Sequence, residues 1–415
     1  YKIFSKKIWK KKQALKNKMK TLKDFNFKGK TVLLRADLNS DVKNGKVLMS
    51  ERIKESAKTI DYLKDKKAKI VVIAHQGRPG KSDFLSLKQH AAFLNKFTKF
   101  KFVDDILGKK AEKAIKNLKN SEVILLDNVR FEEDEFKPEK KDNRLLKLAE
   151  KADIYVNDSF SVCHRNEASI VLFPKHMKNC AGLLFEKEIN ALKKIKLKNC
   201  MFILGGAKPE DNIKLLKRNK VLACGLFGQV CLINKGKKLG EQENYLKKQK
   251  ALIKISKNKL KMVETPIDFA VKKNNKRAEI KLEDFPSKYE IFDIGSRTIK
   301  KYADEIKKAK AIYMKGPAGD FNEKGFAKGT FAILNAIANS KAFSLIGGGH
   351  LSDAVEASGI NKKRFNHISL SGGALLSYIA GEKLPGLEAL GWNSLTLMKH
   401  LQNTVKISRD KLFEI

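Results

Sequence analysis

The chain has 415 residues, 42% of them hydrophobic, and its 87 lysines and arginines outnumber its 46 aspartates and glutamates, for a formal net charge of +41. This length suits two domains, this hydrophobic content excludes a wholly disordered chain, and the lack of any run of about eighteen apolar residues predicts no membrane span. Only eleven of the basic residues are arginine and the lysines are spread along the whole length, so we attribute the charge to a general lysine bias and expect no specific nucleic acid partner.

Residues 1–18 are a basic segment without the apolar core and cleavage site of a secretory signal. We expect either a disordered extension or sequence upstream of the true start at Met19, and in both cases a segment outside the fold. From residue 31 onward, short apolar runs alternate with amphipathic stretches. The sequence predicts strands at 31–39, 68–75, 121–128 and 152–158, and helices at 52–67 and 86–97. Strands of continuous valine, isoleucine and leucine that alternate with helices are typical of a parallel sheet covered on both faces.

A second series of apolar runs begins near residue 199, and each run ends in glycine before a helical stretch. These runs lie at 199–206, 220–225, 310–317 and 341–349. Between the two series, 183–199 has apolar residues at nearly helical spacing and is predicted to be the helix that joins two lobes. The expected fold class is therefore α/β, with two lobes built on mostly parallel sheets.

Five cysteines are scattered along the chain: Cys163, Cys180, Cys200, Cys224 and Cys231. None forms a CxxC pair, and no cysteine–histidine cluster has zinc-like spacing. We therefore expect buried thiols in a reducing cytoplasm rather than disulfides or a metal site.

Arginines gather at the strand ends of the first predicted lobe. Four of the eleven fall in strand-end loops or at helix starts: Arg52, Arg78, Arg130 and Arg165. Asp37 and Asn39 follow the first strand, and His75 follows the second. Because arginine forks bind carboxylate and phosphate oxygens bidentately, the natural ligand is a small acid that carries both groups. For any one of these arginines, the alternative is helix capping or a surface ion pair.

The second predicted lobe offers backbone groups in place of charged side chains. Glycine-rich turns at 205–208, 315–319, 347–349 and 371–373 lie where a strand gives way to a helix. Glycine lets the backbone approach phosphates, and helix N-termini supply oriented N–H groups. The sequence contains neither GxxxxGKS/T nor a GxGxxG that opens the fold, so the four turns predict a nucleotide polyphosphate site of another kind.

Nine motifs occur in the order found in one known family. They are RADLN (35–39), HQGRPG (75–80), DNVRF (127–131), VNDSF (156–160) with HR (164–165), GGAK (205–208), GPAGDF (316–321), FAKGT (326–330), GGG (347–349) and SGGALL (371–376). From about residue 28 to 390 the chain resembles the phosphoglycerate kinase family, and HQGR is similar to the archaeal form of its substrate loop. Several motifs in register make this resemblance specific for fold and family.

The resemblance implies two Rossmann-like three-layer α/β/α lobes. The phosphoglycerate-binding lobe is expected at 19–185, completed by 374–390, whose helix packs back on it, and the nucleotide-binding lobe at 186–373. The family closes like a hinge, and flexing is expected around 183–199 and near 365–373. The last segment, 391–415, extends beyond the family's usual end and could form an amphipathic helix.

The resemblance also implies roles for individual residues. Arg52 and Lys208 are similar to the pair that neutralises the phosphoryl group in flight, with backbone donors from Gly372 and Gly373. Residues implied to bind the phosphoglycerate are Asp37, Leu38, Asn39, Arg52, His75, Gln76, Gly77, Arg78, Arg130 and Arg165. Residues implied to bind the nucleotide are Gly206, Lys208, Asn212, Gly316, Pro317, Asn322, Gly348, Gly349, His350 and Leu351. The implied cofactor is Mg²⁺, bound with ATP or ADP.

The nucleotide half departs from the widespread family pattern. His350 stands at the position of the aspartate in the family's GGGDT motif. Asn322, which precedes Glu323, stands where a ribose-binding glutamate is usual. Asn212 stands where a second lysine is often found. Imidazole is a poor ligand for magnesium, which prefers oxygen. Three hypotheses follow: the ion is held by phosphates and water with Asp320 or Asp353 compensating, nucleotide preference is altered, or catalysis is lost. We favour the first, because Arg52 and Lys208 persist.

The expected function is phosphoglycerate kinase activity in glycolysis and gluconeogenesis, with 3-phosphoglycerate or 1,3-bisphosphoglycerate and ADP or ATP as partners. An acyl phosphate needs no strong general base, so the lack of a catalytic triad fits this chemistry. The alternatives are a ligand-binding protein with a weakened metal site and a nucleic-acid-binding protein driven by the positive charge. We expect a cytoplasmic monomer or homodimer.

Overall fold

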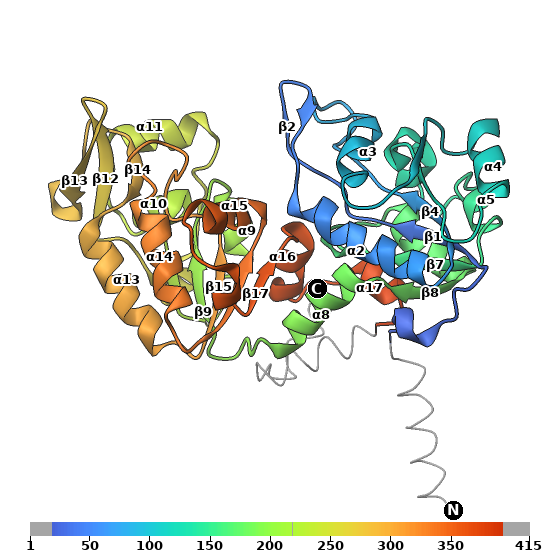
Figure 1. Cartoon of the computed structure of the whole chain (residues 1–415). Helices are drawn as coiled ribbons and strands as arrows, with labels where there is room; N and C mark the ends of the chain where they lie inside the picture. The colour runs from blue at the N-terminus through green and yellow to red at the C-terminus, as the bar shows by residue number, and fades with distance from the viewer. Residues whose placement is uncertain (1–18, 218, 393–415) are drawn as a thin grey trace, which may run out of the picture. The chain divides into compact units, whose positions relative to one another are not determined.

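The computed structural model describes residues 19–217 and 219–392. The predicted extension at 1–18 lies outside the described residues, as does nearly all of the extension predicted at 391–415. The chain divides into two compact units (Figure 1). Of the described residues, the first unit comprises those from Met19 to Asn190 together with those from Gly381 to Trp392, and the second comprises those from Ala191 to Ala380.

The first unit is built on a six-stranded parallel sheet in the order β5-β6-β4-β1-β7-β8. Its strands are β1 (Thr31–Arg35), β4 (Lys69–Ile73), β5 (Lys101–Val103), β6 (Val123–Leu126), β7 (Ile154–Asn157) and β8 (Lys178–Ala181). The four strands predicted from continuous apolar runs are confirmed, each shorter than predicted because the polar motif residues lie beyond the strand. The two edge strands, β5 and β8, are short and begin with lysine, so their apolar signal is weak.

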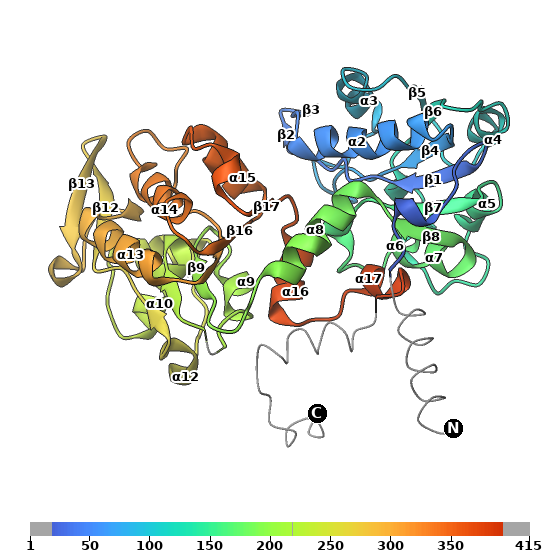
Figure 2. The same cartoon turned by 60° about the horizontal axis from the view of Figure 1, so that its bottom comes forward.

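Helices cover both faces of this sheet. In Figure 2, α2 (Glu51–Asp65) and α3 (Lys88–Leu94) lie on one side of the strands, and α6 (Ala168–Val171) and α7 (Phe173–His176) on the other. Ile53, Ile60 and Leu63 of α2 pack against Val32 and Leu34 of β1 in the main core. The remaining helices of this unit are α4 (Lys109–Lys116), α5 (Leu146–Ala149) and α17 (Pro385–Ala389), and a small hairpin pairs β2 (Val42–Lys43) with β3 (Lys46–Val47).

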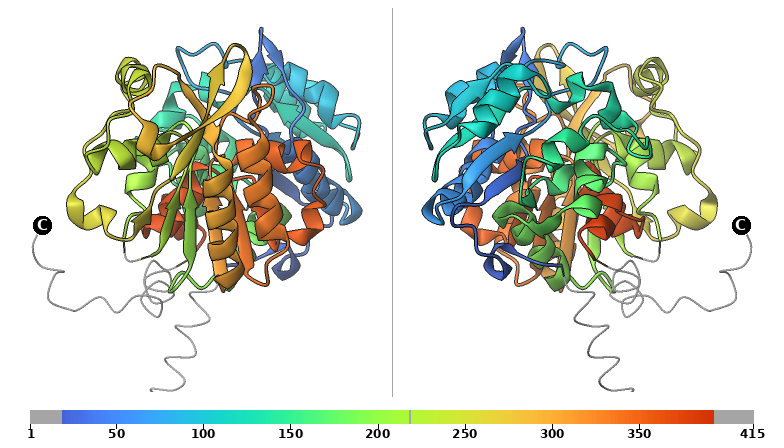
Figure 3. Two further views of the ribbon diagram at one scale, coloured as in Figure 1. Left: turned by 90° about the vertical axis from the view of Figure 1, so that its left-hand side faces the viewer. Right: turned by 90° about the vertical axis from the view of Figure 1, so that its right-hand side faces the viewer.

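The second unit repeats the architecture with a parallel sheet in the order β11-β10-β9-β15-β16-β17. Its strands are β9 (Met201–Leu204), β10 (Val221–Ala223), β11 (Val263–Glu264), β15 (Ala311–Lys315), β16 (Phe343–Gly347) and β17 (His367–Ser369). The helices α13 (Ser296–Lys308) and α14 (Lys328–Ala338) pack side by side (Figure 3, left) and bury Tyr302 and Leu334 against β9 and β15. The other helices are α9 (Pro209–Ile213), α10 (Gly225–Asn234), α11 (Glu241–Lys248), α12 (Lys257–Leu260), α15 (Gly349–Ala357) and α16 (Gly373–Ala380).

The second unit also contains an antiparallel sheet that the sequence analysis did not anticipate. It pairs β12 (Asp268–Lys273) with β13 (Lys276–Lys281) and β14 (Ile291–Ile294) in the order β13-β12-β14. Asn274 and Asn275 both have positive φ and form the hairpin turn between β12 and β13. Apolar residues alternate with lysine and glutamate in β13, which is typical of a half-exposed strand and differs from the continuous apolar runs of the parallel sheets.

The chain passes between the units in α8 (Leu183–Lys194), which lies within the helix predicted at 183–199. The division between the units falls inside this helix, after Asn190. The second passage falls between Ala380 and Gly381, beyond the segment 365–373 in which flexing was predicted.

One boundary needs correction: the segment predicted to complete the first lobe, 374–390, is divided between the units. Residues 374–380, which form nearly all of α16, belong to the second unit. There Leu375 packs so closely on Gly347 of β16 that a side chain at position 347 would collide with it. Lys217 also donates to the backbone O of Ala380 (2.6 Å). The remainder belongs to the first unit, where α17 packs on α6 and Gly386 N donates to Cys163 O (2.9 Å).

Candidate active site

In the first unit, the predicted acid-binding residues lie at the carboxyl ends of the parallel strands. Asp37, His75 and Arg130 are buried, Arg52 and Arg165 are partly buried, and Arg78 is exposed. Burial lowers the pKa of His75 well below its ordinary value, and the positive charges of Arg35, Arg130, Arg165 and Arg52 lower it further. Four guanidinium groups are therefore close enough to His75 to affect its pKa, so these side chains share one region of the unit. The sequence analysis singled out three of the four, Arg52, Arg130 and Arg165.

Hydrogen bonds hold the loops that carry these residues in one arrangement. Gly77 N donates to Asn39 Oδ1 (2.9 Å), and Arg52 Nη1 donates to Asn39 O (3.0 Å). Arg130 Nη1 donates to Gly77 O (2.5 Å), so the loop after β4 is fixed from both sides. Arg52 also lies 3.7 Å from Asp37 in an ion pair. The predicted motifs RADLN, HQGR and DNVRF thus meet in space.

Arg35 belongs to this cluster, although the sequence analysis missed it. Its side chain is fully buried, and Nη2 lies 3.0 Å from His75 Nδ1. A guanidinium can only donate, so His75 accepts at Nδ1 and carries its proton on Nε2. Arg35 thereby sets the tautomer of His75. The available signal was an arginine at the end of an otherwise apolar strand.

Two predicted acid-binding residues use their side chains to build the loop. The Gln76 amide is buried, accepts from Ser40 N (2.9 Å) and donates to Ser40 O (2.9 Å), and its Oε1 lies 3.0 Å from His90 Nε2. The Leu38 side chain is part of the hydrophobic core. Any contact that these two residues make with a ligand must therefore come from their backbone.

The carboxyl group of Asp158 ties the end of β7 to the start of α8. Its Oδ1 accepts from Leu184 N (2.8 Å) and Phe185 N (3.2 Å), while Oδ2 has no hydrogen-bond partner among the described residues. Burial raises the pKa of Asp158 to about 7, even though hydrogen bonds from Thr59 and the two backbone groups oppose the rise. Burial likewise raises the pKa of Glu135 to about 7.

These raised pKa values give the stability a defined pH dependence. The folded chain keeps protons on these carboxyl groups that the unfolded chain releases, so the free energy of unfolding should fall as the pH rises from about 4 through about 7. Asp158→Asn carries no proton to lose, so this variant should lose about 2 kcal/mol less than the wild type between about pH 5 and about pH 8. Urea denaturation of both proteins at the two pH values measures this, and parallel pH profiles would contradict it.

In the second unit, a cavity of about 300 Å³ opens beside the predicted glycine-rich turns. Four of the predicted nucleotide-binding residues line it, Gly206, Pro317, Asn322 and His350. The turns meet closely, because a side chain at Gly316 or Gly205 would collide with the backbone of the other turn, and Gly206 N donates to Pro317 O (2.8 Å). The cavity is therefore walled by backbone that only glycine permits.

Other predicted nucleotide-binding residues lie outside the lining of this cavity. Gly348 has φ of 103° and precedes α15, Gly349 begins that helix, and the Leu351 side chain is buried in the core. Gly372 and Gly373 are exposed at the start of α16. The sequence analysis missed further lining residues, among them Gln242 and Tyr245 of α11, Phe292 of β14 and Glu290 immediately before that strand.

Two lysines lie near each other at the start of α9. Lys208 is exposed and immediately precedes the helix, and Lys315 extends its ammonium to 3.1 Å from Asn212 Oδ1 and 3.4 Å from Asp211 Oδ2. Burial lowers the pKa of Lys315, and the charge of Lys208 adds to that decrease while Asp211 opposes it. Lys315 was not predicted, because in the sequence it looks like the last residue of an apolar strand.

No group of three or more histidine, cysteine, aspartate or glutamate side chains within residues 19–217 and 219–392 could hold a metal ion by itself. Two carboxyl groups line the cavity, those of Asp320 and Glu290. Asp353 is exposed on α15 and is not part of the lining, and Glu323 pairs with Lys272 (2.9 Å). Of the two aspartates considered from the sequence, Asp320 alone borders the cavity. Mg²⁺ often binds through one or two carboxylates, phosphates and water, so this sparse set fits a nucleotide-bound ion.

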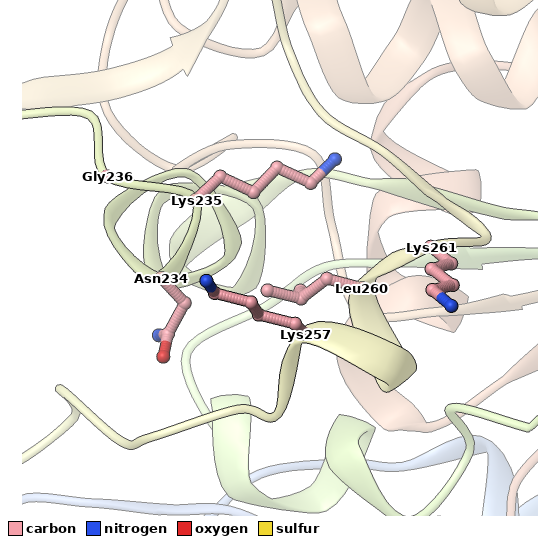
Figure 4. A pocket seen from close by; sticks show the side chains of 6 residues that line it. All are labelled: Asn234, Lys235, Gly236, Lys257, Leu260 and Lys261. Atoms are coloured by element: carbon pink, nitrogen blue, oxygen red, sulfur yellow. The ribbon is translucent and has the colours of Figure 1, made fainter.

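A second hollow in this unit, of about 630 Å³, is lined by Asn234, Gly236, Leu260 and three lysines (Figure 4). The three ammonium groups in Figure 4 point in different directions, and that of Lys235 is bonded to Val263 O (2.6 Å). The hollow therefore offers no convergent set of ligands.

Two simpler expectations also have an outcome. All five cysteines are buried and free, as predicted. In the described parts of the chain, we find no helix with both the length and the apolar character needed to cross a membrane.

Known proteins resemble the chain over almost its whole length. The family model "Phosphoglycerate kinase" matches residues 22–382. Phosphoglycerate kinase of Methanothermus fervidus is 40% identical over 401 residues, which cover 90% of this chain and 97% of the relative, and that of Thermococcus sibiricus is 40% identical over 399 residues, with 89% and 96% covered.

Solved structures agree with these sequence relatives. The crystal structure of phosphoglycerate kinase from Pyrococcus horikoshii matches with a TM-score of 0.83 and 38% identity, covering 91% of this chain and 100% of that one. The structure of phosphoglycerate kinase from Coxiella burnetii matches with a TM-score of 0.71 and 27% identity, covering 90% of this chain and 99% of that one.

Proposed function

The chain belongs to the phosphoglycerate kinase family, and on that premise we propose how its two units move a phosphoryl group between 1,3-bisphosphoglycerate and ADP, giving 3-phosphoglycerate and ATP. It is an enzyme of the kinase class, as its relatives are. The observation that carries the proposal is the cluster of guanidinium groups around His75, a buried neutral histidine at the strand ends of the first unit.

The first unit binds the phosphoglycerate. Arg130, Arg165 and Arg78 supply guanidinium forks for phosphate and carboxylate oxygens, and His75 offers the Nε2 proton that its bond with Arg35 leaves on that atom. Asp37 and Asn39 accept hydrogen bonds, and Oδ1 of Asp37 has no hydrogen-bond partner among the described residues. Asp37 is thus suited to a ligand hydroxyl.

The second unit binds the nucleotide in the cavity of about 300 Å³. The turns around Gly206 and Pro317 bring backbone close to the phosphates, and Tyr245 and Phe292 give the cavity apolar walls for a base. Lys208 and Lys315 place two ammonium groups at the start of α9, where the polyphosphate ends. Mg²⁺ would lower the charge of the phosphates, and Asp320 would hold it together with water.

Arg52 and Lys208 carry the transfer step. The phosphoryl group in flight spreads negative charge over its equatorial oxygens, so cationic groups in fixed positions supply most of the catalysis. The carboxylate of 3-phosphoglycerate is itself the nucleophile, and no side chain needs to remove a proton. Because the acid and the nucleotide are assigned to different units, transfer requires the units to close, with α8 as the hinge.

A coupled assay of purified protein with ADP, Mg²⁺ and 1,3-bisphosphoglycerate tests the proposal. We expect ATP formation at a rate typical of kinases, about 1 to 100 per second. Binding of both ligands without turnover would instead favour a ligand-binding protein of the same fold. Retention on DNA at physiological salt would instead favour a nucleic-acid-binding protein. A cytoplasmic location and a monomeric or dimeric state stay predictions.

A further inference from the structure

A carboxylate lies among the arginines that are assigned to the acid. Glu167 Oε1 accepts from Arg130 Nη2 (2.6 Å) and from Arg165 Nη1 (3.2 Å). Glu167 is 5% exposed, and its Oε2 has no hydrogen-bond partner among the described residues. A buried negative charge therefore occupies two of the groups that a negatively charged ligand would need.

The start of α6 does not require the carboxyl group of Glu167. Glu167 precedes α6, and its backbone O accepts from Ile170 N (2.9 Å) and Val171 N (3.0 Å), which completes the first turn without the carboxyl group. The side chain makes no capping bond. It is directed at the arginines instead, and an uncharged residue could begin the helix equally well.

The arginines do need an anion when no ligand is bound. The Arg130 side chain is 1% exposed, its Nε has no hydrogen-bond partner among the described residues, and its other neighbours include the like charges of Arg165 and Arg35. A buried charge without a counter-charge is strongly destabilising. Glu167 supplies that counter-charge, and a bound phosphate or carboxylate would supply it again.

We propose that Glu167 is a resident counter-anion, which holds Arg130 and Arg165 in place in the empty site and competes with the phosphoglycerate for them. The proposal rests on the function given above. Glu167 is then a residue that sets affinity: it stabilises the empty protein and weakens the binding of every anionic ligand of this site. Weaker uniform binding leaves the transfer step unchanged and favours release of 3-phosphoglycerate.

Glu167→Gln tests the proposal, because glutamine keeps the shape and the accepting oxygen and removes only the charge. Titration calorimetry with 3-phosphoglycerate should give a Kd about tenfold lower than that of the wild type, as expected when one like charge a few ångströms from the ligand is removed. Inorganic sulfate should stabilise the variant against thermal unfolding at correspondingly lower concentrations than it does the wild type. The melting temperature of the ligand-free variant should be lower than that of the wild type.

Glu112→Gln is the matched control, because Glu112 pairs with Lys151 on the surface of the same unit (3.1 Å) and its loss changes the net charge equally. The control should bind 3-phosphoglycerate like the wild type. A Kd for Glu167→Gln that is unchanged or higher would overturn the proposal and leave Glu167 as a residue that only aligns the arginines.

Glu167→Asp provides a second variant, should Glu167→Gln not fold. It keeps the charge on a shorter side chain, so the Kd should stay within about threefold of the wild-type value, whereas loss of alignment would raise it about tenfold and overturn the proposal. The proposed function fails separately: a wild-type protein that neither binds 3-phosphoglycerate nor turns over would refute it whatever the variants do.

Discussion

Replacing Lys208 with alanine is expected to lower kcat about a thousandfold while leaving the fold intact. Removal of one group that stabilises developing negative charge costs about a hundredfold to a thousandfold in other enzymes, and a cation at a migrating phosphoryl group belongs to that class. Lys208 is exposed, so its loss should change the free energy of unfolding by less than about 0.5 kcal/mol. Coupled kinetics and thermal denaturation of the same preparation measure both quantities.

Lys261→Ala is the control for this variant. Lys261 is also exposed in the second unit, and it borders the hollow in which we find no convergent ligands. Its loss removes the same charge from the protein and should leave kcat within about twofold of the wild-type value. If Lys208→Ala behaved like Lys261→Ala, the phosphoryl group would have to be neutralised elsewhere.

Replacing Arg130 with methionine is expected to damage both stability and acid binding. The change removes one partner of a buried ion pair and leaves Glu167 with Arg165 alone, which should cost about 3 kcal/mol of the free energy of unfolding. Burial lowers the pKa of Arg130 to about 10, so the side chain still carries its charge at neutral pH. The KM for phosphoglycerate should rise about a hundredfold, since a charge-assisted fork is lost, and the KM for the nucleotide should change little.

Arg144→Met shows what loss of an exposed arginine costs in the same unit. Arg144 pairs with Glu132 (3.2 Å), but its side chain is 58% exposed, so this pair should contribute less than about 1 kcal/mol. Denaturation curves and initial rates for the two variants separate a general effect of lost charge from a specific one. Equal behaviour of the two variants would remove Arg130 from the site.

The fold was predictable where burial on both faces produces an unbroken apolar run. The strands around Leu33, Val71 and Leu125 were found this way, whereas the helix that begins at Leu183 was found from the nearly helical spacing of its apolar residues. Prediction failed where an element is short, as in the three residues of β5, which carry little periodic signal, and where a strand is half-exposed, as in β13 after the turn at Asn274. The division of 374–390 could not be predicted, since it depends on the packing of Leu375 against Gly347.

The arrangement of the candidate site was predictable to the level of residue type and strand end, whereas the roles of its residues stay predictions. Arginines beyond the strands were recognisable because the chain has so few of them. Arg35 and Lys315 were missed because both are the last residues of strands, where a charged side chain looks like an interruption of the apolar run. Glu167 was missed because an acidic residue before a helix is ordinary, and only the bonds to Arg130 and Arg165 show otherwise.

A crystal structure of the protein with 3-phosphoglycerate, ADP, Mg²⁺ and a metal fluoride in place of the migrating phosphoryl group would test the central claim most directly. We expect the acid on Arg130, Arg165 and His75, the nucleotide beside Pro317, and the fluoride in contact with both Arg52 and Lys208. A fluoride bound away from either of these two residues, or an acid bound outside the arginine cluster of the first unit, would contradict the account.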